Sequence, residues 1–147
     1  MTKIGGAVSW SVGSDKRIKS NIKEDVPGLA FINLLHPVTY NLDIHKQMAI
    51  TGADKRKDFK PWDGMYDIEK IRMTGFLAQD VEAAAKSIGY DFSGVDVPKN
   101  NTSLYGLKYA DFVVPMVKAI QEQQQIIQKQ QKTIDDLMKR VEKLEQK

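Results

Sequence analysis

The sequence has no cysteine and no long apolar run, and neither sign of charge dominates it. Without cysteine the chain can form neither disulfides nor thiolate metal sites, and its redox compartment stays undetermined. No stretch of about 18 apolar residues occurs, so we expect neither a membrane-spanning helix nor a signal peptide. The 22 basic and 19 acidic residues are interspersed, which argues against a face dedicated to nucleic acid.

The 147 residues, 41% of them hydrophobic and 28% charged, suit one small domain with an appendage. We expect residues 1–13 to be the end of a preceding shaft or linker, because Gly5-Gly6 and the alternating stretch 7–12 are typical of the interior of a longer chain. Residues 14–110 would form a globular part with a charged surface protrusion over 43–70. Residues 111–147 would form a long helix.

Apolar periodicity and breakers predict an α+β fold for the globular part. Short strands are expected over 7–12, 38–42, 71–77 and 104–109. A helix over 25–35 would begin at Asp25 as N-cap and end before His36-Pro37, because the residue before proline disfavours the helical region. A second helix over 79–88 would end at Gly89, and 90–103 reads as loop.

The C-terminal stretch, from Asp111 as N-cap candidate, has no glycine and carries five heptads in one register. This pattern predicts a parallel coiled coil of about 55 Å at about 1.5 Å per residue. A helix packed on its own domain is the alternative. The predicted core has at position a Val113, Ile120, Ile127, Ile134 and Val141, and at position d Met116, Gln123, Gln130, Leu137 and Leu144.

The number of helices in the coil stays open. Branched residues at a with leucine at d favour a dimer, whereas Val117 and Met138 at e and Ile126 at g widen the stripe as a trimer requires. The glutamines at d either fix the register or weaken the coil locally.

Four blocks of sequence, over 14–22, 35–40, 74–82 and 109–122, share an order with a known family. Together they resemble the endosialidase-type intramolecular chaperone domain, found at the C-termini of phage tailspikes, tail fibres and neck appendages, of bacterial surface proteins and of a membrane-bound animal transcription factor. The first block matches the family's S-D-x-R-x-K-x-N-I pattern, and the four blocks cover nearly the whole chain from Ser14 onward.

The resemblance implies a domain that forms a homotrimer, assists folding of its own preceding β-rich shaft, and releases itself by serine autoproteolysis. The cut would fall between Gly13 and Ser14, with Ser14 as nucleophile and Lys19 as general base. Asp15, Arg17 and Asn21 complete the motif as supporting residues. No cofactor, nucleic acid, membrane or small-molecule substrate is implied, and the setting would be a phage tail or a bacterial surface.

The proposed chemistry needs a particular local shape. A lysine activates a serine only after burial or neighbouring cations lower its pKa, and Lys16 and Arg17 are such cations. Residues five apart lie on opposite faces of a strand and about 140° apart on a helix, so the pair must meet through a bend or across subunits. By residue type alone, Ser14 and Lys19 are ordinary turn residues.

Other functions have weaker support. A permanent trimerisation cap that never cuts, or a coiled-coil adaptor for unrelated proteins, would use the same helix. His36 and His45 lie on different predicted elements with no third ligand at metal spacing, so no metal site is expected. Trp10 and Trp62 are interpreted as residues that pack in a core or an interface. The run Lys55-Arg56-Lys57 with Lys60 is interpreted as a solvated loop, which could also bind an acidic shaft.

Overall fold

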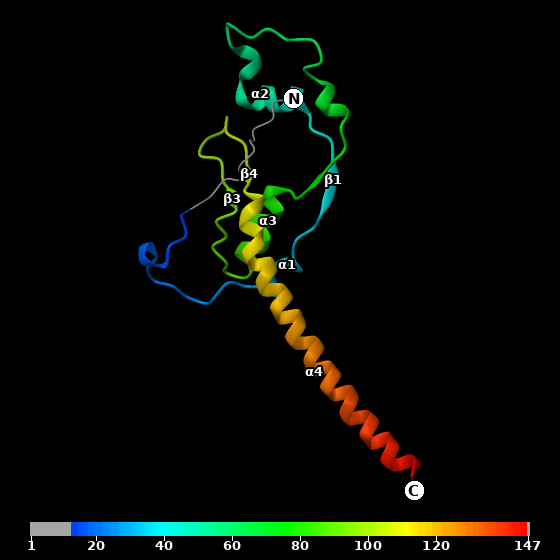
Figure 1. Ribbon diagram of the computed structural model, residues 1–147. Helices are drawn as coiled ribbons and strands as arrows, with labels where there is room; N and C mark the ends of the chain where they lie inside the picture. Colours follow the sequence, from blue (N-terminus) through cyan, green and yellow to red (C-terminus); the bar gives the residue numbers. More distant parts are fainter. Residues whose placement is uncertain (1–12, 147) are drawn as a thin grey trace.

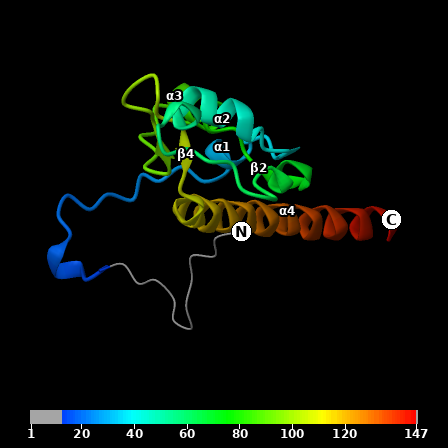
Figure 2. The ribbon, with the colours of Figure 1, turned by 90° about the horizontal axis from the view of Figure 1, so that it is seen from above.

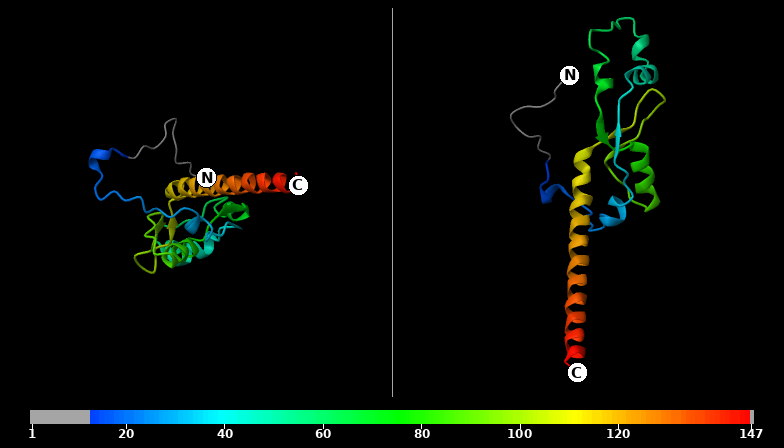
Figure 3. Two further views of the ribbon diagram at one scale, coloured as in Figure 1. Left: turned by 90° about the horizontal axis from the view of Figure 1, so that it is seen from below. Right: turned by 90° about the vertical axis from the view of Figure 1, so that its right-hand side faces the viewer.

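The computed structural model describes residues 13–146, and the strand predicted over 7–12 lies outside them. Figure 1 shows a small body of short helices and strands from which one long helix extends; Figures 2 and 3 show that the body lies along one side of this helix near its N-terminal end. The α+β class with a long C-terminal helix is therefore confirmed.

Two separate two-stranded antiparallel sheets form the β part. Strand β1 (Val38–Tyr40) pairs with β2 (Met73–Gly75), and β3 (Val95–Asp96) pairs with β4 (Gly106–Leu107). Strands β1, β2 and β4 fall where strands are predicted, whereas β3 lies in the stretch predicted as loop. Isolated two-stranded sheets are marginal in water, so these depend on packing against the helices.

Helix α1 (Leu29–Ile32) has four residues and follows Gly28 as its N-cap, so the prediction of a longer helix capped by Asp25 is wrong. Its first backbone N–H, that of Leu29, donates instead to Glu122 Oε2 at 2.8 Å. The carboxylate comes from the C-terminal helix. A side chain distant in the sequence therefore accepts the hydrogen bond from the free N–H at the start of α1, a role that was expected of a local cap.

Helix α3 (Ala78–Ser87) confirms the prediction, and so does its end. Gly89 has φ of +67°, its N–H donates to Lys86 O at 3.1 Å, and Tyr90 N–H donates to Ala85 O at 2.9 Å. This pair of bonds is a Schellman motif, in which glycine takes the left-handed conformation without steric cost. The motif turns Tyr90 back toward the core.

The stretch 43–70 carries helix α2 (Ile44–Thr51) and the 3-10 turns η2 (Ala53–Lys55) and η3 (Asp67–Lys70). It extends from the body at the end opposite to the C-terminus of the long helix (Figures 1 and 3). The helix was not predicted, and only Met48 of its eight residues is buried.

The core is aromatic and joins α1, α3 and the start of the long helix. Phe31 is fully buried, and its ring centroid lies 4.9 Å from that of Phe92, which lies 4.8 Å from that of Phe112 in an edge-to-face contact. Val81 and Ala85 of α3 complete the buried cluster. Edge-to-face aromatic pairs contribute stability beyond their buried area.

Helix α4 (Val113–Glu145) follows the 3-10 turn η4 (Tyr109–Phe112). Asp111 is not its N-cap, contrary to the prediction, and instead accepts a hydrogen bond from Ser93 Oγ at 2.9 Å. Only Pro115 and Ala119 of α4 are buried, so the body holds its first turns and the remainder projects away (Figure 1). Within residues 13–146, no helix is long and apolar enough to cross a membrane.

Candidate functional site

The motif at the start of the described chain folds into a tight bend. Asp15 accepts a hydrogen bond from Arg17 N at 2.8 Å and so caps the 3-10 turn η1 (Lys16–Ile18). Lys19 N–H donates to Lys16 O at 3.2 Å and closes the turn. An aspartate that bonds the backbone two residues onward is a common initiator of such turns.

The bend brings the side chains of Ser14 and Lys19 together. Lys19 Nζ donates to Ser14 Oγ at 2.7 Å. Of the two routes open to residues five apart, the structure therefore has the bend within one chain. Both side chains are exposed in the single chain.

Arg17 is paired with Asp15. Arg17 Nη2 lies 2.6 Å from Asp15 Oδ2, and Arg17 Nε donates to both carboxylate oxygens at 3.1 Å. These bonds and the one from the Arg17 backbone hold the pKa of Asp15 below its ordinary value, and the pKa of Arg17 is raised in turn by Asp15. The Arg17 guanidinium is therefore paired with a carboxylate of its own turn.

Residues 14–25 form an exposed arm with apolar side chains in solvent. Ile18 is 72% exposed and Ile22 is 63% exposed. Asn21 has φ of +53°, a left-handed conformation that asparagine tolerates, and it redirects the chain after the turn. Both isoleucines therefore leave apolar surface uncovered on this arm of the single chain.

The base of the arm is anchored to α4 at Gly28, which is buried. A Cβ atom added there would lie 2.7 Å from Ala119 N and 2.6 Å from Glu122 Oε2. Only glycine permits this approach of the two backbones.

The predicted coiled-coil stripe is uncovered on this chain. Its apolar a and d side chains are exposed to fractions between 43% for Met116 and 70% for Leu144, and Gln123 and Gln130 are exposed as well. The body instead contacts the flank that carries Phe112, Pro115 and Ala119. The structure thus does not pack the stripe on its own domain.

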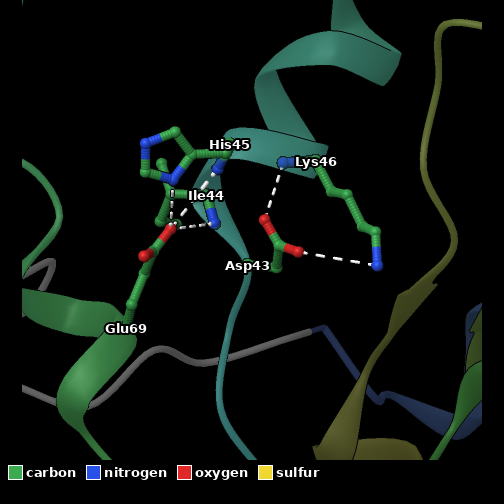
Figure 4. Close-up of polar contacts among 5 residues, drawn as sticks. All are labelled: Asp43, Ile44, His45, Lys46 and Glu69. Carbon is green, nitrogen blue, oxygen red and sulfur yellow. Dashed lines mark hydrogen bonds and ion pairs between the residues drawn. The ribbon is translucent and has the colours of Figure 1, made fainter.

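A cluster at the base of the protrusion joins Asp43, His45 and Glu69, whose potential ligand atoms lie within 4.8 Å of one another (Figure 4). Sequence analysis missed it because Glu69 is 24 residues beyond His45. Glu69 Oε1 accepts from Ile44 N at 2.7 Å and contacts His45 Nδ1 at 3.0 Å. Asp43 accepts from Lys46 N at 2.8 Å. The carboxylates therefore cap the start of α2.

Two further contacts fit this structural role for the cluster. The His45 ring stacks on that of Tyr66, with centroids 4.0 Å apart. Partial burial raises the pKa of Glu69, but hydrogen bonds from His45 and from the backbone of Ile44 outweigh it and leave the pKa lowered. The carboxylate is held ionised by donors within the chain, so the cluster joins η3 to α2.

Comparison with protein families gives a match to the family described as chaperone of endosialidase, over residues 14–90. The match begins at Ser14, contains the Ser14–Lys19 bend, and extends through α3 to Tyr90. No curated protein and no solved structure gives a significant match. Because the matched segment is more than half of the 147 residues, the chain belongs to the endosialidase chaperone family.

Proposed function

We propose that this chain is a trimeric intramolecular chaperone that assists folding of the polypeptide preceding it and then cuts itself free between Gly13 and Ser14. The observation that carries the proposal is the 2.7 Å hydrogen bond between Lys19 Nζ and Ser14 Oγ. Each region of the chain has its own role in this proposal. Residues 1–13 are the end of the shaft, residues 14–110 form the chaperone body, and residues 111–147 hold the three copies together.

The proposed step uses the serine on the amine side of the bond that breaks. Ser14 Oγ attacks the carbonyl carbon of Gly13 while the neutral amine of Lys19 takes its proton. The C–N bond then breaks, and Lys19 returns the proton to the departing nitrogen of Ser14. The product is an ester between Gly13 and Ser14 Oγ. Water hydrolyses this ester, which leaves a Gly13 carboxylate and restores the hydroxyl of a new N-terminal Ser14.

The proposal couples this step to assembly. A lysine is a base only when its amine is neutral, and burial is the strongest means of favouring the neutral form. Ser14 and Lys19 are exposed in the single chain, and the neighbouring Ile18 and Ile22 are exposed apolar groups. Covering this arm in the trimer would desolvate the amine, so cutting would follow correct assembly.

The uncovered a and d residues support self-association through α4. Three copies are favoured over two because exposed Val117, Ile126 and Met138 flank the a and d stripe. Family membership supports an upstream tail or surface protein as the partner, and a phage tail or bacterial cell surface as the location.

The test is the intact mass of freshly expressed chain with its natural upstream segment attached. The parent should yield a fragment beginning at Ser14, and Ser14→Ala and Lys19→Gln should each abolish it while leaving the trimer intact. Lys23→Gln is the matched control, since it removes one exposed positive charge from the same arm and should cut normally. Cutting by the Lys19→Gln variant at the parental rate would refute the role of Lys19.

The second candidate is a permanent trimerisation cap that never cuts. It is favoured by the exposure of Ser14 and Lys19, because water favours the charged form of a lysine side chain, which has no lone pair with which to accept a proton. An uncut parent that is nonetheless trimeric in light scattering would select this function.

A further inference from the structure

The two flanks of α4 differ at the level of the body. In the heptad register with Val113 at a, Phe112 and Ala119 fall at g and Pro115 at c, and all three are buried against the chain's own body. Glu122, also at c, bonds Leu29 N of α1. The body therefore occupies the c/g flank.

The opposite flank, b and e, is apolar and open at the same level. Val114 at b is 59% exposed and Val117 at e is 49% exposed. They line a groove of about 370 Å³ together with Val26 at the base of the arm, and Glu24, Lys118 and Gln121 complete its wall. An apolar groove with charged residues in its wall is typical of a protein contact.

The apolar character of this flank ends where the body ends. The b positions further along α4 are all polar: Gln121, Gln128, Asp135 and Glu142. A b position points outward in a coiled coil and needs no apolar residue for the coil itself. Val114 therefore has a role that the coil does not supply, at the one level where a neighbouring body can reach it.

Coil geometry identifies the neighbour. In a parallel coiled coil the e flank of each helix lies against the g flank of the next. Each body sits on the c/g flank of its own helix, so the next copy's body faces the b/e groove of the first. We propose that the Val114–Val117 groove is a docking surface for the globular part of a second copy, in the trimer of the proposed function on which this inference rests.

This contact would also reach the arm. Glu24 and Val26 line the groove, so a neighbour seated there touches the chain a few residues after Lys19. The trimer would then be closed by a ring of body contacts above the coil, and each arm would begin at a seam between two copies.

The absence of cysteine allows a direct test by thiol reactivity. Val114→Cys and Gln128→Cys each introduce a single thiol at a b position, the second below the body. In the assembled chain, modification of Cys at 114 by a small disulfide reagent should be at least about tenfold slower than at 128. Adding Ile134→Asp to disrupt the coil should make the two rates equal.

Each outcome decides one question. A trimer in which the two thiols react equally fast overturns the docking surface and leaves the proposed function standing. Protection at 114 that persists in the dissociated variant also overturns it, since the cover is then within one chain. A parent chain that is never trimeric removes the proposed assembly itself. As a second readout, Val114→Glu should raise the concentration of half-dissociation about tenfold, and Gln128→Glu should leave it unchanged.

Discussion

Substituting Gly28 by alanine should separate the arm from α4 at its anchor. The new Cβ would lie 2.7 Å from the backbone nitrogen of Ala119, which cannot rotate away, and 2.6 Å from Glu122 Oε2. Overpacking of a buried site costs about 1–3 kcal/mol, and we expect a loss in the upper half of that range because backbone must move.

The assay is urea unfolding followed by circular dichroism at one fixed protein concentration, since the proposed association would contribute to the measured stability. Gly106→Ala is the control, because the new Cβ would lie 3.5 Å from Asp96 Cβ, which is an ordinary van der Waals contact. It should change the free energy of unfolding by less than about 0.5 kcal/mol. A Gly28→Ala chain as stable as the parent would refute the close packing of α1 on α4.

Three further predictions concern the coil, the bend and the core. Ile134→Asp should convert the proposed trimer to monomer in light scattering, whereas Lys132→Asp on the outer face should not. Asp15→Asn should slow self-cleavage, measured by mass, about tenfold because the bend loses its cap and its pairing with Arg17. Since the pKa of Asp15 is lowered on folding from 3.8, its contribution to the bend is full above that pH and lost as the pH falls through the lowered pKa. Phe31→Ala should lower the unfolding free energy by about 3–5 kcal/mol in urea titration, because its ring is fully buried among Tyr90 and Phe92.

The elements that sequence predicted well are those whose determinants are local. Helix α3 repeats its apolar residues at helical spacing and ends at Gly89, which the structure has at φ of +67°. The length of α4 follows from an unbroken heptad pattern. Periodicity of this kind needs no knowledge of what the element packs against.

The elements that sequence mispredicted depend on distant partners. The cap of α1 is Glu122, 93 residues beyond Leu29, and β3 is a strand only because it pairs with β4. Helix α2 did carry a local signal, the Asp43 cap, but Met48 is its single buried residue, so no apolar stripe marked it. Apolar periodicity is a weak guide when the body buries so little of a helix.

The sequence also predicted the candidate site only in part. Family resemblance drew attention to Ser14 and Lys19, but spacing alone predicted that they could not meet on a regular element. What brings the two side chains together is nevertheless a local contact, because Asp15 accepts a hydrogen bond from Arg17 N and bends the chain. An aspartate before a short polar run could have suggested this turn, since Asp is a frequent turn initiator.

The arm that carries the Ser14–Lys19 pair joins the body beside both α4 and Tyr90 of the aromatic core. Among residues 13–146, the hydrogen bonds made by residues 14–24 stay within the arm. The chain at the base of the arm lies against α4 at Val26 and Gly28, and Asp25 and Pro27 line a pocket with Ile88 and Tyr90. Any change in what surrounds the first turns of α4 therefore acts at the base of the arm. The α4 surface exposed in one chain is the surface that the proposed association would cover, so an arm that joins the body beside it is well placed to respond to assembly.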